Sequence, residues 1–421
     1  MPNGNVITIV WELRNESQSL QEGRDSSLVA ISGLWPDYLL EYNPTLDSVV
    51  WEWHAWDHMV QDYDPALANF GVVADHPELF DLNFSSNGAN PDWLHLNAVD
   101  YNAQLDQLLF SSPQWNEIFI IDHSTTTLEA ASHTGGNSGM GGDILWRWGN
   151  PITYQAGDST DQVFYFQHDA HWIPQGYPNE NKIILFNNGR GRSPIEYSSV
   201  EILEPSILSG GSYELAGDGK FLPIATDFTY TSPTVTDFFS KIISSADQLP
   251  NGNIIIDEGT KGHYFEIDTL GNVVWDYVNP VVGDSILTQE QIIPGTSTLF
   301  NSTFRARRYG MSHPGLPFLA LVNQGPIELN PYPSMCAVGI NEMVEEPQFR
   351  LFPNPATESI TIATDAANYS YRIINSLGQQ MQSGKLTNST IDIQSLNSGI
   401  YLVHLFNDAT NTKSVVRLIK R

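Results

Sequence analysis

Imidazole and guanidinium side chains gather in a few short stretches of this sequence, and these are its best candidates for chemistry. QHDAHWIPQG contains His168, NPDWLHLNAVDYN contains His95, and FNNGRGRSP contains Arg190 and Arg192. A neutral imidazole can attack an electrophile or take a proton, and a guanidinium fork can hold the oxygens of an anion. Histidines near an arginine therefore predict transfer of an anionic group. His171 follows His168 at a spacing of three, so we expect it to pack away from the reaction.

A second histidine-rich stretch, WEWHAWDHMVQDYD, contains His54 and His58, and VVADHPEL adds His76. A metal site built from these three histidines is one alternative, and ordinary packing of His54 and His58 in a tryptophan-rich loop is another. The HExxH, GxSxG and Walker motifs are absent, and the nearby aspartates lack EF-hand spacing. We therefore expect no metal site and no cofactor.

Related segments recur along the chain and predict how these residues are positioned. PNGNVITIVWE at the start matches PNGNIIIDEGT at 250–260, and TLDSVVWEW matches TLGNVVWDY; GGDILWRWGNP is a third copy and FTYTSP a weaker fourth. Asn-Gly favours the turn between antiparallel strands, and apolar β-branched runs are typical of strands. Short strands in repeating sets of about four predict a β-propeller, with an array of β-sandwiches as the alternative.

In a propeller the innermost strand of each blade lines the central channel. DWLHLNAVDY and QHDAHWI both precede the next strand of their blade, so we expect His95 and His168 at one axial site although they are 73 positions apart. Arg192 lies in a glycine-rich turn that should reach the mouth of the same channel. The PNGN at residues 2–5 reads as the middle of a blade, and no signal peptide precedes it. We therefore expect an upstream segment outside this sequence.

The composition narrows the class of protein. The 421 residues include 48 acidic and only 19 basic side chains, which argues against a nucleic-acid partner, because phosphate binding needs clustered Lys and Arg. No apolar run is long enough for a membrane span. The single cysteine, Cys336, excludes an internal disulfide. Few charges and 11 tryptophans favour an extracytoplasmic, β-rich protein.

The end of the chain differs from the rest. Residues 347–421 hold 7 Lys and Arg against 4 Asp and Glu, whereas the preceding residues hold 12 against 44. This step predicts a propeller over 1–340, a linker over 341–348 and a small Ig-like β-sandwich over 349–421. In the last segment LFPNPA, NSLGQ, SGIYLV and the basic KR end resemble the type A sorting domain of the type IX secretion system. The resemblance implies handling by that machinery, export through the outer membrane, and release or surface attachment. A generic Ig-like module is the alternative.

The first segment resembles the arylsulfotransferase family over most of 1–330. The similarity rests on VVWEWHAWDH, DWLHLNAVDYN, IIDHSTTT, GGDILWRWGNP, QHDAHW, NNGRGRSPIEYSSVEI and LPNGNIIIDEG, in that order. The resemblance implies an all-β, six-bladed propeller. It also implies transfer of a sulfuryl group from a phenolic sulfate to a phenol, without a nucleotide cofactor, by a ping-pong route through a sulfated histidine in the channel.

Carried over residue by residue, the resemblance assigns His95 and His168 to channel histidines and Arg192 to the arginine that holds sulfate oxygens, with Arg190 as a close competitor. The family's nucleophilic histidine is expected beside the second PNGN strand, where this chain reads FFSKIISSADQLPNGN without a histidine. His263 is the nearest, so His95, His168 or His263 would have to be the nucleophile. The expected substrate contacts are completed by Arg190, His54, His58, Trp93 and Asn97.

Two functions therefore remain open from the sequence. The first is a secreted sulfotransferase acting on aryl sulfates and phenols. The second is a non-catalytic secreted propeller that binds a surface or a glycan. Convergence of His95, His168 and Arg192 on one point would favour the first.

Overall fold

The computed structural model describes all residues except 210, 290, 292–300, 311–312, 314–315, 317–324, 331–350, 363–368, 376–378, 387–388 and 408–411. The chain divides into two compact units, residues 1–330 and 331–421, which we describe separately. The linker expected over 341–348 and Cys336 lie outside the described residues.

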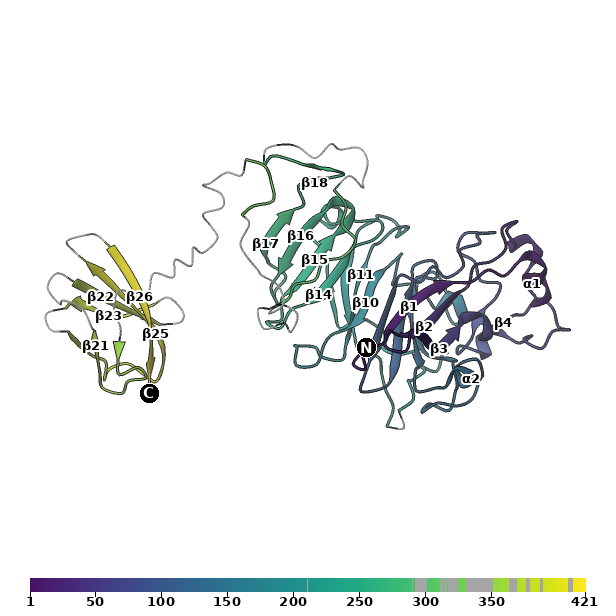
Figure 1. Ribbon diagram of the computed structural model, residues 1–421, viewed down its shortest axis with the longest axis horizontal. Helices are drawn as coiled ribbons and strands as arrows, with labels where there is room; N and C mark the ends of the chain where they lie inside the picture. The colour runs from purple at the N-terminus through teal and green to yellow at the C-terminus, as the bar shows by residue number, and fades with distance from the viewer. Residues whose placement is uncertain are drawn as a thin grey trace. The chain divides into compact units, whose positions relative to one another are not determined.

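The first unit consists of antiparallel sheets that follow one another along the chain (Figure 1). In strand order they are β1 (Val6–Trp11), β2 (Asp37–Asn43), β3 (Ser48–His54); β6 (Ala98–Asn102), β7 (Gln107–Ser112), β8 (Glu117–Asp122), β9 (Ile144–Trp148); β10 (His168–Trp172), β11 (Ile183–Asn187), β12 (Ser199–Leu203), β13 (Phe228–Tyr230); and β14 (Ser245–Gln248), β15 (Ile254–Glu258), β16 (His263–Ile267), β17 (Val273–Val278).

Short elements join these sheets. Two parallel strands, β4 (Met59–Val60) and β5 (Phe80–Asp81), and the antiparallel pair β18 (Val281–Val282) and β19 (Ser285–Ile286) supplement them. The described helices are short: α1 (Glu16–Gln21), α2 (Thr127–Ala130) and the 3₁₀ turns η1 (Ser26–Leu28), η2 (Ala55–Asp57), η3 (Val73–Asp75), η4 (Pro151–Tyr154), η5 (Val235–Asp237) and η6 (Gly259–Lys261). The all-β prediction is confirmed.

The repeats seen in the sequence occupy equivalent places in the sheets. The three tryptophan-bearing copies and FTYTSP contribute β3, β9, β17 and β13, each the last strand of its sheet. PNGN precedes β1 and β15 alike, so β1 corresponds to the second strand of the fourth sheet. The repeating unit of the sequence is thus one blade-like sheet, which ends with the same kind of strand each time, as in a propeller.

The sheets stack face to face, and the second and third sheets bury both of their faces. In β7, Leu108 and Phe110 enter the core shared with the first sheet, whereas Leu109 enters the core shared with the third. Successive side chains of a strand point to opposite faces, so one apolar strand serves two cores. A further core joins the third and fourth sheets through Phe186 of β11 and Ile256 of β15, among others. This stacking holds the first strands of neighbouring sheets side by side.

The second unit is a small β-sandwich (Figure 1). Its two sheets are β20 (Leu351–Phe352), β21 (Ser359–Ile362), β24 (Thr390–Asp392), and β23 (Gln380–Lys385), β22 (Tyr369–Asn375), β25 (Gly399–Asn407), β26 (Thr412–Lys420). Ile360 and Ile391 from the first sheet pack with Ile373, Val403 and Leu405 from the second. The predicted C-terminal sandwich is therefore confirmed.

A buried ion pair ties β8 to β9 in the first unit. The guanidinium of Arg147 donates from Nε to Glu117 Oε1 at 3.0 Å, and both side chains are fully buried. Arg147 also donates to the Leu79 carbonyl at 3.0 Å and to Thr153 Oγ1 at 2.8 Å. Because its hydrogen bonds are satisfied, the pair is tolerated inside the stack, but neither charge can lose its partner cheaply.

We therefore expect Arg147→Met to lower the free energy of unfolding of the first unit by about 3–5 kcal/mol, because it leaves Glu117 buried and unpaired. Adding Glu117→Gln to this variant should restore part of the loss. Tryptophan fluorescence during urea unfolding measures this unit alone, since all 11 tryptophans precede residue 331. Lys220→Ala, which breaks the partly exposed pair of Lys220 with Asp161, is the control and should change little. Equal losses of unfolding free energy in Arg147→Met and Lys220→Ala would contradict the importance of the buried pair.

Candidate active site

His95 and His168 lie just before or at the start of the first strands of adjacent sheets, β6 and β10. The two strands are linked by side chains: Asn97 Nδ2 donates to the Gln167 carbonyl at 2.7 Å, and Asp100 Oδ2 accepts from the Trp172 amide at 2.8 Å. The backbone of His95 is left-handed, with φ of 54°. Such a conformation costs energy in a residue with a side chain and is held only when the surroundings fix it.

The ring of His168 is oriented by Asn188, which follows β11. His168 is 6% exposed, and its Nδ1 lies 2.8 Å from Asn188 Oδ1 and 3.1 Å from the Phe166 carbonyl oxygen. The amide nitrogen of Asn188 donates to the Ser240 and Ile243 carbonyls at 2.6 and 2.8 Å, which fixes Oδ1 toward the histidine. Two oxygen acceptors at Nδ1 place the proton there. The lone pair is consequently on Nε2.

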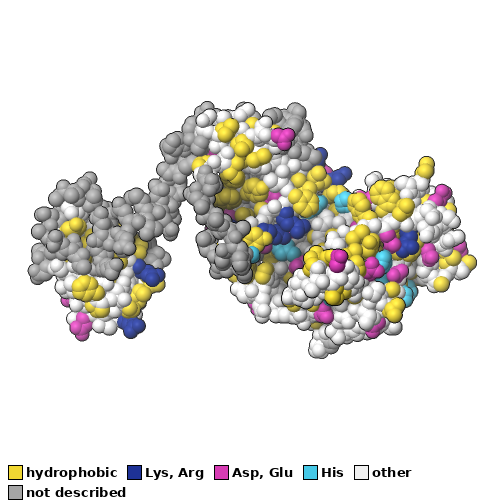
Figure 2. All heavy atoms as spheres, viewed as in Figure 1, with side chains coloured by type: hydrophobic (Ala, Val, Ile, Leu, Met, Phe, Trp, Pro, Cys, Tyr) yellow, Lys and Arg dark blue, Asp and Glu magenta, His cyan; other side chains and the backbone are white. Residues whose placement is uncertain are grey.

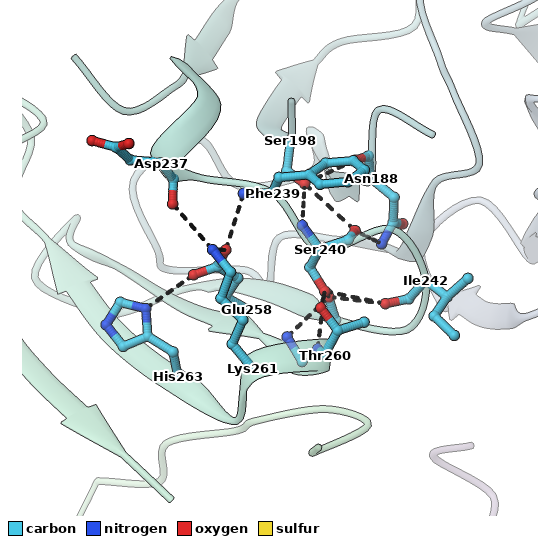
Figure 3. A network of polar contacts seen from close by, with 12 residues as sticks. Asn188, Ser198, Asp237, Phe239, Ser240, Ile242, Glu258, Thr260, Lys261 and His263 are labelled. Carbon is cyan, nitrogen blue, oxygen red and sulfur yellow. Dashed lines mark hydrogen bonds and ion pairs between the residues drawn. The ribbon is translucent and has the colours of Figure 1, made fainter. Parts of the chain in front are cut away.

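A hydrogen-bonded cluster supports this clamp from the loop before β14. Figure 3 shows Asn188 and Ser198 meeting Ser240. Ser198 Oγ donates to the Asn188 carbonyl at 2.8 Å and accepts from the Ser240 amide at 2.9 Å, while Ser240 Oγ donates to Thr260 Oγ1 at 2.9 Å. The chain positions Asn188 through buried polar contacts between the third and fourth sheets.

The two histidines are electrostatically different. Burial lowers the pKa of His168 to about 4, against a smaller opposing effect of the bond to Asn188. The hydrogen bond to Asp92, with Nδ1 2.5 Å from Oδ2, is the main cause that raises the pKa of His95. The charge of His95 also lowers the pKa of His168. One imidazole is thus held neutral while the other is favoured as a cation, which separates a nucleophile or base from an acid.

Asp37 adds a further acid to the neighbourhood of His95. Its Oδ1 accepts from the Leu96 amide at 3.2 Å, and burial is the main cause that raises its pKa to about 7. Neither Asp37 nor Asp92 is among the residues expected from the sequence. The i−3 spacing of Asp92 to His95 is the signal that could have suggested it.

The loop after β11 carries both arginines expected from the sequence. The guanidinium carbon of Arg190 lies 4.4 Å from the centre of the Phe166 ring, which is itself 6.1 Å from the His168 ring. Arg192 stacks on Tyr197 at 4.1 Å and donates to Ser199 Oγ at 3.3 Å. Through Phe166, Arg190 is connected to His168, whereas Arg192 points toward β12.

Two further arginines approach the residue after His168. Arg307 forms a two-pronged pair with Asp169 at 2.7 and 2.8 Å, and Arg305 Nε lies 2.8 Å from the same carboxylate. The segment that carries them docks through the Thr303 amide on Gly259 and the Ala306 amide on Ser245. Figure 2 shows basic and histidine side chains gathered on one face of the first unit. The sequence signal is the alternation of arginine in FRARRYG.

Comparison with known proteins identifies the family. Residues 1–285 match the model of the arylsulfotransferase family, and residues 350–421 match that of the secretion system C-terminal sorting domain. The chain belongs to the arylsulfotransferase family. Its sorting domain is that of type IX secretion and directs export through the outer membrane to the cell surface or the medium. Among the described residues no helix has the length and apolarity to cross a membrane.

More distant similarities are structural. A protein of unknown function from Bacteroides caccae is 10% identical, with a TM-score of 0.22 over 59% of this chain and 72% of that one. PorZ, a surface component of the type IX secretion system of Porphyromonas gingivalis, is 11% identical, with a TM-score of 0.17 over 93% and 57%. Virginiamycin B lyase from Staphylococcus aureus is 10% identical, with a TM-score of 0.26 over 66% and 75%. No curated protein matches the chain.

In the fourth sheet of this arylsulfotransferase family member, a serine lies before the first strand, where the second sheet has His95. Ser244 directly precedes β14, as His95 lies shortly before β6, and its φ of 88° is also left-handed. Its hydroxyl accepts from the Gly259 amide at 3.0 Å and donates to Ser240 Oγ at 2.8 Å. His263 lies instead on the third strand, β16, between Glu258 at 3.1 Å and Asp276 at 2.7 Å. Figure 3 shows His263 turned toward Glu258.

The remaining expected contacts have structural partners. His54 lies 3.3 Å from Glu12 and stacks on Tyr38, and Trp93 is buried, with its Nε1 donating to the Phe84 carbonyl. Asn97 bridges to β10 as described above. His58 is fully buried, with both ring nitrogens facing oxygen atoms. His171, expected to face away, has its Nε2 3.3 Å from Asp247 Oδ1.

The pKa of His168 gives a prediction for stability against pH. Its folded pKa of about 4 lies below the ordinary value of 6.5, so the unfolded chain binds the proton first as pH falls. As the pH falls from 6.5 to 4, the free energy of unfolding of the wild type should therefore decrease by up to about 3 kcal/mol more than that of His168→Gln. Below pH 4 the difference should not grow further, because both states then bind the proton. Unfolding of both proteins by urea at several pH values, followed by tryptophan fluorescence, measures the difference. Parallel stability curves would show that His168 is not held neutral.

Proposed function

We propose that this exported protein transfers a sulfuryl group from a phenolic sulfate to a phenol, with His168 Nε2 as the nucleophile. The observation that carries the proposal is the clamp on Nδ1 by Asn188 and Phe166, which leaves the lone pair on Nε2. Burial keeps this imidazole neutral and hence nucleophilic at neutral pH. Membership of the arylsulfotransferase family supports the reaction class.

In the first half-reaction, Nε2 attacks the sulfur of the donor and the bond from sulfur to the phenolic oxygen breaks. The electron pair of that bond stays on the phenolic oxygen, which takes a proton from the imidazolium of His95. Asp92 favours that imidazolium through its hydrogen bond. The product phenol leaves, and the sulfuryl group remains on His168.

The sulfated ring is positively charged, and its Nδ1–H keeps the bonds to Asn188 and Phe166. In the second half-reaction the acceptor phenol gives its proton to His95, which is now neutral. The phenolic oxygen attacks sulfur, and the bond from sulfur to Nε2 breaks with its electron pair returning to nitrogen. Both partners regain their starting state, so the cycle consumes no cofactor.

The sulfuryl oxygens carry negative charge throughout and need cationic donors. Arg190 is the better placed of the two loop arginines, because it lies over Phe166 beside the His168 ring. Arg192 remains a proposed second donor from the same loop. Arg305 and Arg307 add positive charge next to Asp169, although that carboxylate occupies part of their hydrogen-bonding capacity. Preorganised donors of this kind stabilise a developing charge without having to reorganise.

One observation favours a second candidate. The segment beside the second PNGN strand, where the family resemblance leads us to expect a histidine, contains none. Ser244 lies in this segment, and its hydroxyl is already engaged by Gly259 and Ser240. A member without that histidine could serve as a non-catalytic module that binds a surface or a glycan. The two candidates differ in whether the purified protein turns over a sulfate donor at all.

We expect the full-length protein to release nitrophenol from nitrophenyl sulfate in the presence of a phenol acceptor, and His168→Ala to slow this by roughly 10³-fold or more. His263→Ala should keep most of the rate, because both of its ring nitrogens already face carboxylates. Release of the coloured phenol is followed by absorbance. The reverse ranking would assign the nucleophile to His263, and no release by folded wild-type protein would leave the binding module as the function.

A second set of substrates tests the acid. Replacing His95 by Gln should cost about 10²–10⁴-fold for sulfates of weakly acidic phenols, whose oxygen needs a proton as it leaves, and much less for nitrophenyl sulfate. Asp92→Asn should change the rates in the same direction by a smaller factor. The measurement is the slope of log kcat/KM against the pKa of the leaving phenol. An equal loss for all donors would make His95 a binding residue instead.

A further inference from the structure

A second cluster of polar side chains converges at the outer edge of the second sheet, beside the last strand rather than the first. Asp143 directly precedes β9, and its Oδ1 lies 2.7 Å from His58 Nδ1 and 2.8 Å from His133 Nδ1. The three ligand atoms lie within 4.8 Å of one another. In the part of the chain that the structure describes, this is the single group of three such side chains. We propose that it binds a divalent transition-metal ion of the zinc type.

The donor set selects the class of ion. Two imidazoles and one carboxylate are ligands that zinc and its neighbours prefer, whereas calcium and magnesium take mainly oxygen. Three protein ligands leave a fourth position for water or another ligand. The histidine alternative considered from the sequence is different, because His54 and His76 pair with Glu12 and Glu78 instead.

His58 has the surroundings of a preorganised ligand. It is fully buried, and its second ring nitrogen, Nε2, lies 2.7 Å from the Ala130 carbonyl oxygen. Metal-binding histidines typically donate their other N–H to such an oxygen, which fixes the ring orientation. Trp53 stacks on the imidazole with the ring centres 5.7 Å apart and the planes within 6°. Nδ1 is therefore fixed toward Asp143.

The glycine-rich loop SHTGGNSGMGG brings His133 to the same point. A Cβ on Gly141 would lie 2.1 Å from the Ser132 carbonyl, and one on Gly142 would lie 2.6 Å from His58 Nε2. Only glycines allow the end of the loop to approach its first residues and His58 so closely. His133 itself has a side chain that is 60% exposed, so it can move outward to make room for an ion about 2.0–2.2 Å from each donor atom.

The test uses the full-length protein freed of metal with a chelator and titrated with zinc chloride. We expect one zinc ion to remain bound per chain after gel filtration, measured by elemental analysis. His133→Ala and Asp143→Asn should each weaken the affinity about tenfold or more in calorimetry. Cobalt should give the visible spectrum of a tetrahedral site in the wild type and lose it in both variants.

The matched control is His76→Ala, which removes another partly exposed histidine, 2.9 Å from the carboxylate of Glu78. Zinc affinity should be unchanged in that variant. Because His133 is exposed, its removal should leave the fold intact, which tryptophan fluorescence checks. A folded wild type that retains no zinc, or zinc binding that is indifferent to both ligand variants, would overturn the proposal. The cluster would then be a hydrogen-bonded His-Asp-His group only.

Discussion

The bond between His168 Nδ1 and Asn188 Oδ1 is the contact on which the proposed chemistry depends, because it decides which nitrogen of the imidazole is free to react. Asn188 cannot turn its oxygen away without losing two donations to the carbonyls of Ser240 and Ile243. Those carbonyls belong to the segment before β14, in the next sheet. The tautomer of a residue in one sheet is therefore set by the packing of that sheet against its neighbour.

Environment, rather than residue type, separates the histidines of this protein. His168 is held neutral by burial, and His95 is favoured as a cation by the carboxylate of Asp92. His263 has a carboxylate at each ring nitrogen and an increased pKa, which suits an ion pair better than a nucleophile. Placing two imidazoles of opposite preference at adjacent strands supplies a nucleophile and an acid without any metal ion in the proposed transfer.

The sequence was informative where a physical pattern repeats. The PNGN turns and the Trp-x-Trp strands predicted the sheets, since turn chemistry and alternation act locally. The positions of His95 and His168 at strand starts predicted that each opens the innermost strand of a blade and that the two meet at one axial site. The sequence did not predict the contacts made by Asn188 and Asp37 or the pair of Arg305 with Asp169. These contacts join segments that only tertiary packing brings together. The structural partners of His54 and Trp93 were equally invisible in the sequence.

The central claim is that the sulfuryl group passes through His168 Nε2. The most direct measurement is mass spectrometry of the full-length protein incubated with nitrophenyl sulfate and no acceptor, followed by peptide mapping under conditions that preserve an N–S bond. We expect the mass of one added SO₃ group on the peptide that contains His168, and its loss once a phenol is added. A sulfuryl group found on His95 or His263, or donor turnover with no modified histidine, would contradict it.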